Sequence, residues 1–272
     1  MAKRKRRKSG NSAGPIIASV ILGALSLIIL GGFVYLKILA NSNPELDKAS
    51  LCPVDGPKEI TAFLVDVTDP ISNTTATDLR NQFEAAVSAV PVGGLVQVYT
   101  LTEAEGELTR TFNKCNPGSR ENVDEWTSNP DLAQKRWEEG FQKPLDEIAK
   151  RMDQGVAGKQ SPIMAGVQKI NLEAFGAPKY RDIPKQLIVA SDMIEHTSSF
   201  SIYRDGVDYA NFEKSPARDQ FRTALDGISV RILAFQRPNL KFDAKQLADF
   251  WDAWVLNNRG AIEEFTRLEG IR

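Results

Sequence analysis

The strongest constraint on the fold is a short, mostly apolar segment that ends on an acidic residue. Residues 60–65 (ITAFLV) have the composition of a strand buried on both faces, and Asp66 follows at once. Residues 186–191 (QLIVAS) repeat the pattern before Asp192. Ligands of open α/β sheets bind beyond the carboxyl ends of the strands, so two such strands, if neighbours, bring two carboxylates to one edge. A cap for the following turn is the simpler interpretation of one aspartate, whereas two of them favour a site.

Predicted strands and helices alternate along the chain after residue 58. Further strands are predicted at 95–101, 108–113 and 228–235, and helices at 76–90, 132–152, 163–175, 216–225 and 244–257. Ser161 is expected to cap the helix that follows it, with Pro162 in the first position, and Pro144 to kink or split its helix. The alternation predicts an α/β fold: a doubly wound, mostly parallel sheet with helices on both faces and one antiparallel edge strand.

A basic N-terminus followed by a long uncharged segment predicts a membrane anchor. Residues 1–10 hold six Lys or Arg and no acid, and residues 15–36 hold no charge. The uncharged run spans a ~30 Å hydrocarbon core at ~1.5 Å per residue, and it exceeds the roughly 7–15 apolar residues of a cleaved signal peptide. We therefore predict one transmembrane signal anchor at residues 15–40, preceded by a basic cytoplasmic tail at residues 1–14.

The charge distribution sets the orientation of this anchor in the inner (cell) membrane. Basic residues stay on the cytoplasmic side, so the linker at 41–57 and the domain at 58–272 are expected in the periplasm or at the exterior of a bacterial cell. All 35 acidic residues but only 27 of the 34 basic residues follow residue 40, so this part carries a net charge of −8. An acidic domain argues against binding of nucleic acid, which depends on neutralising phosphates.

The two cysteines, Cys52 and Cys115, leave two alternatives open. An even pair in an exported domain favours a disulfide, which would tie the segment after the anchor to a loop beside the sheet. Two buried free thiols are the other alternative. No spacing of Cys and His supports a metal site made from these residues.

Six residues with oxygen in their side chains follow the predicted strands or precede a helix, where they could share one site. They are Asp66, Thr68, Asp69, Ser72, Ser161 and Asp192. Carboxylates and hydroxyls are hard ligands of the kind that Mg²⁺ and Ca²⁺ prefer. The residue types therefore predict a divalent cation, Mg²⁺ or alternatively Mn²⁺ or Ca²⁺. A set of side chains that only cap and cross-link the loops is the alternative.

The order of these motifs resembles the von Willebrand factor type A fold with its metal-ion-dependent adhesion site. A strand followed by D-x-T-D and a helix, an edge hairpin, Ser-Pro at a helix start and then LIVASD occur in that order over roughly residues 58–258. The family's pattern is D-x-S-x-S in the first loop, a Thr or Ser in a second loop and an Asp at a strand end. By position, the matching residues are Asp66, Thr68, Ser161 and Asp192.

One residue departs from the family's pattern. Pro70 stands where the second Ser is expected, and the side chain of proline has no oxygen. The site therefore lacks one ligand unless Asp69 or Ser72 replaces it.

The resemblance implies a binding module, not an enzyme. In the family, the ion keeps an open position that receives a carboxylate from a protein partner, because a cation held by two carboxylates and neutral hydroxyls still attracts an anion. We expect divalent-metal-assisted protein binding within an envelope assembly. A contact surface is expected at His196, Phe200 and Tyr203, with packing under the long loop as the alternative for at least one of the aromatic rings. Two alternatives stay open: a metal-dependent hydrolase that uses the same acidic edge, and a structural subunit whose metal site is non-functional.

A reporter enzyme fused after residue 272 tests the predicted orientation. Because the basic tail holds the N-terminus in the cytoplasm, the reporter should be active only if it functions outside the cytoplasm. Activity of a cytoplasmic reporter at the same position would overturn both the orientation and the disulfide.

Overall fold

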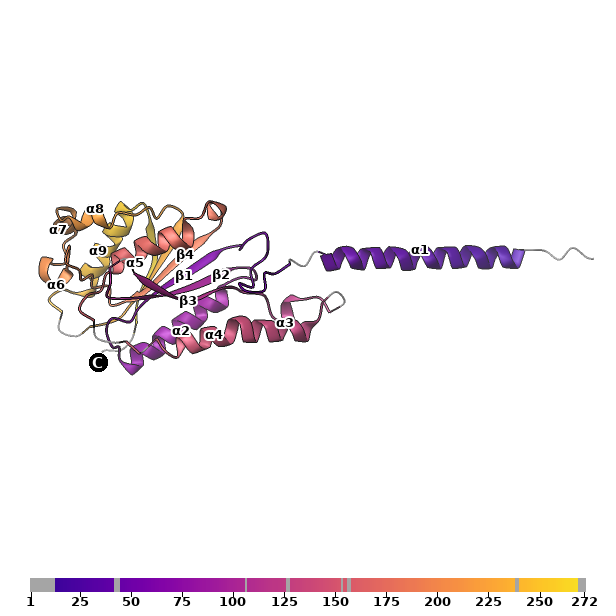
Figure 1. The fold of residues 1–272 in the computed structure, drawn as a ribbon, viewed down its shortest axis with the longest axis horizontal. Helices are drawn as coiled ribbons and strands as arrows, with labels where there is room; N and C mark the ends of the chain where they lie inside the picture. Colours follow the sequence, from indigo (N-terminus) through magenta and orange to yellow (C-terminus); the bar gives the residue numbers. More distant parts are fainter. Residues whose placement is uncertain are drawn as a thin grey trace, which may run out of the picture.

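The molecule contains a six-stranded sheet whose order is β3-β2-β1-β4-β5-β6 (Figure 1). The computed structural model describes residues 13–41, 45–105, 107–125, 128–152, 154–155, 158–237 and 240–268. The strands are β1 (Ile60–Asp66), β2 (Leu95–Leu101), β3 (Leu108–Cys115), β4 (Lys185–Ser191), β5 (Ile228–Ala234) and β6 (Ala261–Arg267). All neighbouring pairs are parallel except β2 and β3, which are antiparallel. The predicted fold class is therefore confirmed.

Strand β1 lies in the interior of the sheet, and all seven of its residues are buried. Its side chains alternate between the two faces: Leu64 belongs to the apolar core on one face, and Phe63 and Val65 to the core on the other. The first of these cores is packed tightly, because a Cβ added at Gly166 would lie 3.0 Å from Leu64 Cδ2 and 2.9 Å from Leu101 Cδ1. Glycine at this position lets a helix approach the strands closely.

Helices cover both faces of the sheet, as Figure 1 shows. On the face of Phe63 lie α2 (Asn73–Ala89), α3 (Pro130–Trp137), the π-helical turn η2 (Glu138–Gln142) and α4 (Lys143–Ala149). On the face of Leu64 lie α5 (Ile163–Ile170), the π-helical turn η3 (Asn171–Phe175) and α9 (Ala244–Asn257). Shorter helices are η1 (Arg120–Asn122), η4 (Pro178–Tyr180), α6 (Ile202–Asp205), α7 (Tyr209–Glu213) and α8 (Ala217–Gln220).

Three predicted helices differ from the structure. The helix predicted at 76–90 begins at Asn73, because the Ser72 hydroxyl accepts a hydrogen bond from the Thr75 N–H. The helix predicted at 132–152 contains a π-helical turn directly before Pro144, and this wider turn accommodates a residue that lacks an N–H. The helix predicted at 216–225 is wrong in length, since only the four residues of α8 are α-helical.

Strand β6 was not predicted. Its sequence, AIEEFTR, is half polar, and the strand lies at the edge of the sheet, where no residue of β6 is buried. An apolar run indicates a strand that is buried on both faces, so this signal is absent from β6, and no hairpin partner indicates the strand either.

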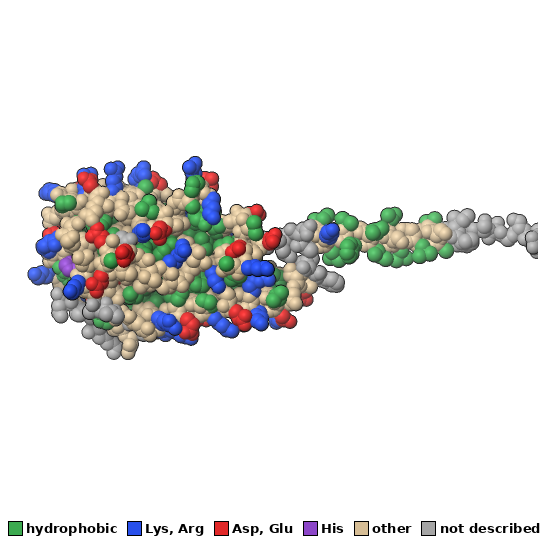
Figure 2. Space-filling model, viewed as in Figure 1, with side chains coloured by type: hydrophobic (Ala, Val, Ile, Leu, Met, Phe, Trp, Pro, Cys, Tyr) green, Lys and Arg blue, Asp and Glu red, His purple; other side chains and the backbone are tan. Residues whose placement is uncertain are grey.

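The N-terminal helix α1 (Ala13–Asn41) is long and apolar enough to cross a membrane. The 22 residues of Ile17–Ile38 would extend about 33 Å at 1.5 Å per residue. The side chains of 17–38 are exposed, and Figure 2 shows them as a largely apolar surface beside a domain with many charged groups. This finding fits the predicted anchor at 15–40, while residues 1–12 of the predicted basic tail lie outside the described residues.

The segment after α1 is held against the edge of the sheet at which the parallel strands begin. Cys52 and Cys115 form a disulfide with an S–S distance of 2.04 Å. Of the two alternatives for the cysteines, a disulfide or two free thiols, the structure has the disulfide. Cys115 is paired with Leu95, the first residue of β2. The Lys58 N–H donates to the Gly93 carbonyl (3.0 Å). Residues 45–57, predicted as part of a linker, are thus fastened to the domain.

Removal of the disulfide should destabilise the domain. The bond joins residues 63 apart in the sequence, so it restricts the unfolded chain, and the Cys52→Ala/Cys115→Ala variant should lose about 2–4 kcal/mol of the free energy of unfolding. Denaturant titration of the full chain in detergent, followed by tryptophan fluorescence, measures this loss. A reductant should destabilise the wild type and leave the double variant unchanged. Equal midpoints for wild type and variant would contradict the prediction.

Candidate functional site at the carboxyl edge of the sheet

The carboxyl ends of β1, β4 and β5 meet at one edge of the sheet, as expected for the two aspartates. We call this edge and the residues that follow it (66–72, 158–162, 191–205 and 235–237) the rim. β1 and β4 are direct neighbours, with Val65 paired to Ala190. Asp66 and Asp192 are therefore brought together, and they are only 7% and 4% exposed.

Asp66 accepts hydrogen bonds on both carboxylate oxygens. Oδ1 accepts from the Thr68 N–H (2.9 Å) and the Thr68 hydroxyl (2.6 Å). Oδ2 accepts from the hydroxyls of Ser161 (2.9 Å) and Ser191 (2.7 Å). Hydrogen bonds to a charged group are stronger than neutral ones, and four of them compensate for the removal of this carboxylate from water. Asp66 thereby joins three segments that are far apart in the sequence.

Asp192 is paired with a residue that the sequence did not point to, Arg237. Asp192 Oδ1 accepts from the Ile194 N–H (3.0 Å), and Oδ2 accepts from Arg237 Nε (2.8 Å). Arg237 Nη1 donates to the Pro70 carbonyl (2.9 Å), and Nη2 lies 3.2 Å from Asp69 Oδ2. The guanidinium group therefore bridges the loop after β4 and the loop after β1.

The pKa of Asp192 is raised to about 6. Burial is the largest cause, and the negative charge of nearby Asp66 acts in the same direction. The guanidinium of Arg237 and the Ile194 N–H lower this pKa, but they do not offset the burial. One guanidinium thus pairs with the buried carboxylate of Asp192 and with the more exposed carboxylate of Asp69.

Two of the predicted ligands, Ser161 and Ser72, differ from each other in what they contact: Ser161 binds Asp66, whereas Ser72 caps a helix. Ser161 does not cap α5, because its hydroxyl donates to Asp66 and its side chain points to the rim. The N-terminus of α5 is instead capped by the carboxylate of Glu195, whose Oε2 accepts from the Met164 N–H (2.9 Å). Ser72 caps α2 and also shares a hydrogen bond with the Thr75 hydroxyl (2.9 Å).

The expected contact surface is only partly exposed. Tyr203 is 57% exposed and meets the half-buried ring of His196 edge-on, with 5.7 Å between ring centroids. His196 also forms a backbone bridge with Ser161, so it lies beside the predicted site. Phe200 was wrongly placed on this surface: it is fully buried and packs on Phe212 and Phe250 at centroid distances of 5.2 and 5.8 Å. An apolar ring under a long loop fills the core.

Three residues at the rim were missed by the sequence analysis: Ser191, Glu195 and Arg237. Ser191 is the last residue of β4, directly before Asp192. Because side chains alternate between the two faces of a sheet, the sequence could have shown that these two residues face opposite sides of it. Glu195 is completely buried, and burial raises its pKa well above the ordinary value. Arg237 follows β5, so the carboxyl end of a third parallel strand was the signal that could have found it.

A cavity of about 250 Å³ opens beside Arg237, between the ends of β5 and β6 and the start of α9. Apolar side chains form much of its wall: Leu240, Phe242, Leu247 and Phe265. Two guanidinium groups, those of Arg237 and Arg267, and two carboxylates, those of Asp192 and Asp243, also line it. The rim therefore offers an apolar depression with charged groups of both signs.

The donor set, as these side chains are arranged, does not fit an additional divalent ion. Asp192, the predicted last ligand, is paired with Arg237, and Asp69, the predicted substitute for the missing serine, is paired with the same group. Within the described part of the chain, no group of three or more His, Cys, Asp or Glu side chains is placed to hold a metal. The predicted ion stays a prediction.

Comparisons with known proteins found similar folds among solved structures. No family model matches the chain, and no curated protein matches it. The chain is similar to the conserved hypothetical protein BatB from Bacteroides thetaiotaomicron, with 12% identity over 79% of this chain and 92% of that chain and a TM-score of 0.38. An aerotolerance-related membrane protein from Bacteroides fragilis matches with 13% identity, 78% and 92% coverage and a TM-score of 0.34.

A von Willebrand factor type A protein from Catenulispora acidiphila matches with 12% identity, 78% of this chain, 39% of that chain and a TM-score of 0.40. The mostly parallel sheet, with one antiparallel edge strand and Asp66 at the end of β1, agrees with the fold that the sequence predicted. The chain has a von Willebrand factor type A fold. Identities and TM-scores this low carry no functional argument.

The raised pKa of Asp192 predicts a pH-dependent stability. The folded state binds this proton more tightly than the unfolded state, whose ordinary pKa is 3.8, so the contribution of Asp192 is present below pH 3.8 and lost as the pH rises through about 6. The free energy of unfolding should fall by roughly 2–3 kcal/mol over this interval relative to Asp192→Asn.

Denaturant titrations of wild type and Asp192→Asn between pH 4 and pH 7 measure this difference. Asp69→Asn is the matched control, because Asp69 contacts the same guanidinium but is 43% exposed, and it should follow the wild type. Parallel curves for wild type and Asp192→Asn would contradict the prediction.

Proposed function

We propose that this chain is a membrane-anchored, extracytoplasmic protein-interaction module that binds its partner with the rim. The observation that carries the proposal is the placement of the rim relative to α1. The segment that follows α1 is fastened to the edge at which the parallel strands begin, through the disulfide and the pairing of Cys115 with Leu95. The rim lies at the other edge, one strand length away.

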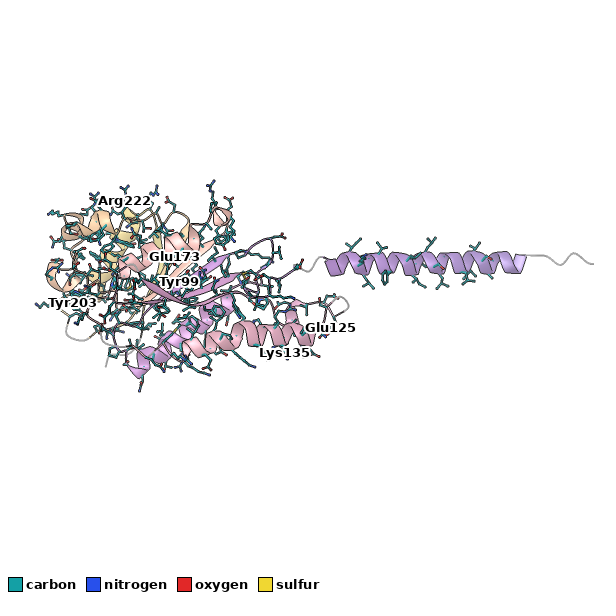
Figure 3. The ribbon with its side chains drawn as sticks, in the orientation of Figure 1. Tyr99, Glu125, Lys135, Glu173, Tyr203 and Arg222 are labelled. Atoms are coloured by element: carbon teal, nitrogen blue, oxygen red, sulfur yellow. A yellow bond between two sulfur atoms is a disulfide. The ribbon has the colours of Figure 1, made fainter. Side chains whose placement is uncertain are left out.

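This arrangement presents the rim away from the membrane. A strand of seven residues spans about 23 Å at 3.3 Å per residue, so a partner at the rim stays clear of the lipid surface. Figure 3 shows Tyr203 at the end of the domain far from α1, and Glu125 at the end near it. A module held at one edge and exposed at the other is suited to reach a second protein within an envelope assembly.

The rim has the chemistry of a protein contact. Tyr203 supplies an exposed aromatic ring, and aromatic residues are enriched in interfaces. The cavity beside Arg237 combines apolar walls with the guanidinium of the exposed residue Arg267, a group that pairs well with carboxylates. A partner segment with a carboxylate next to an apolar side chain fits this combination, and it agrees with the carboxylate-bearing partner expected from the sequence. A divalent ion at the rim remains a separate prediction.

Site-specific photo-crosslinking in intact cells tests the proposal. A photoreactive phenylalanine analogue in place of Tyr203 should give a discrete adduct with a second protein. Leu172 is the matched control, because its side chain is 67% exposed and it lies away from the rim. It belongs to η3, which continues α5 from the rim towards the opposite edge of the sheet. Adducts of equal yield at both positions, or none at Tyr203, would argue against a contact at the rim.

A further inference from the structure

The guanidinium of Arg237 occupies the position between the loops that a metal ion is expected to bridge. The type A resemblance assigned the first loop, with Asp66 and Thr68, and the third loop, with Asp192, to one ion. In the structure, Arg237 makes the link between these loops, through Asp192 on one side and Asp69 with the Pro70 carbonyl on the other. Its side chain is 21% exposed, so the group is largely withdrawn from water.

We propose that Arg237 is a tethered cation that takes the place of the divalent ion and excludes it, so that the rim of the wild-type protein is complete without metal. The domain supplies its own positive charge from the end of β5. The proposal concerns the same rim as the proposed function, but it requires no partner.

The balance of charge supports this inference. Asp66 and Asp192 bring two carboxylates into a region that is almost free of water, and Asp69 adds a third that is less buried. Buried carboxylates need a nearby cation or dense hydrogen bonding. Asp66 has four hydrogen bonds from hydroxyls and an N–H, whereas Asp192 has one backbone N–H and the guanidinium. Arg237 is thus the cation on which Asp192 depends.

The departure at Pro70 supports it independently. Proline removes the hydroxyl that the family's pattern supplies, but its backbone carbonyl accepts a hydrogen bond from Arg237 Nη1. Of the two side chains that could replace this hydroxyl, Ser72 caps α2 and Asp69 is paired with Arg237. The first loop has therefore lost a side-chain ligand for a metal, while its backbone carbonyl serves as an acceptor for the arginine. A planar guanidinium with several N–H donors fits three separate acceptors, which a lysine would not match as well.

Removal of the guanidinium should convert the rim into a metal site. In Arg237→Gln, the carboxylates of Asp192 and Asp69 would lose their cation. The carboxylate of Asp66 and the hydroxyls of Thr68 and Ser161 would remain beside them. These are hard oxygen ligands, so Mn²⁺ or Mg²⁺ should bind. Arg267→Gln is the matched control, because Arg267 lines the same cavity and contacts Gln236 but is not paired with Asp192.

The experiment is calorimetric titration of the full chain in detergent with Mn²⁺, together with thermal unfolding in Mn²⁺ and in chelator. Wild type and Arg267→Gln should show no saturable binding and equal melting temperatures in both conditions. Arg237→Gln should bind Mn²⁺ at least tenfold more tightly than wild type, equivalent to about 1.4 kcal/mol, and should melt higher with Mn²⁺. Addition of Asp66→Ala to Arg237→Gln should abolish this binding.

Saturable binding of Mn²⁺ by the wild type that Asp66→Ala removes would overturn the proposal, as would a folded Arg237→Gln variant that binds no metal. If Arg237→Gln does not fold even with Mn²⁺, the Arg237→Lys variant provides the test, because lysine keeps the positive charge. Binding of Mn²⁺ to this variant that is no tighter than binding to the wild type supports the proposal. Tighter binding of Mn²⁺ overturns it. Because no partner is present, the result is independent of the crosslinking test of the rim.

Discussion

The burial of Asp66 at the end of β1 is the constraint on which the rest of the rim depends. A carboxylate that is 7% exposed is costly unless hydrogen bonds replace its water. The four bonds to Asp66 come from the loop after β1, from the residue before α5 and from the end of β4. The hydrogen bonds to one carboxylate therefore fix the relative positions of three segments, because Ser161 and Ser191 follow Asp66 by 95 and 125 residues.

The strands that the sequence predicts most directly are those with the most burial. Strand β1 is a nearly continuous apolar run, and β4 and β5 each hold at least three consecutive apolar residues, so their composition identifies them. Strand β6 is half polar because it lies at an exposed edge, and the helix predicted at 216–225 is mostly irregular although its composition is helical. Local propensity is a weak prior where tertiary packing decides the outcome.

The candidate site divides in the same way. Asp66, Thr68, Ser161 and Asp192 were found because each follows a recognisable strand or precedes a helix, and the structure brings them to one rim. Arg237 was not found, because no short motif links it to Asp192, which lies 45 residues earlier. Only the topology, with β5 beside β4, brings these two residues together.

Arg237 also explains how a departure from the family's pattern can be accommodated. Loss of a hydroxyl at Pro70 would leave a metal ion with one ligand fewer. A guanidinium instead needs hydrogen-bond acceptors, and the backbone carbonyl of Pro70 accepts a hydrogen bond as well as a side chain would. A covalently attached cation also costs no translational entropy when it binds, unlike an ion from solution. It holds the loops after β1 and β4 together at the edge of the sheet that lies away from α1. If Arg237 replaces the ion as we propose, the rim is preorganised for a partner whatever the concentration of metal around it.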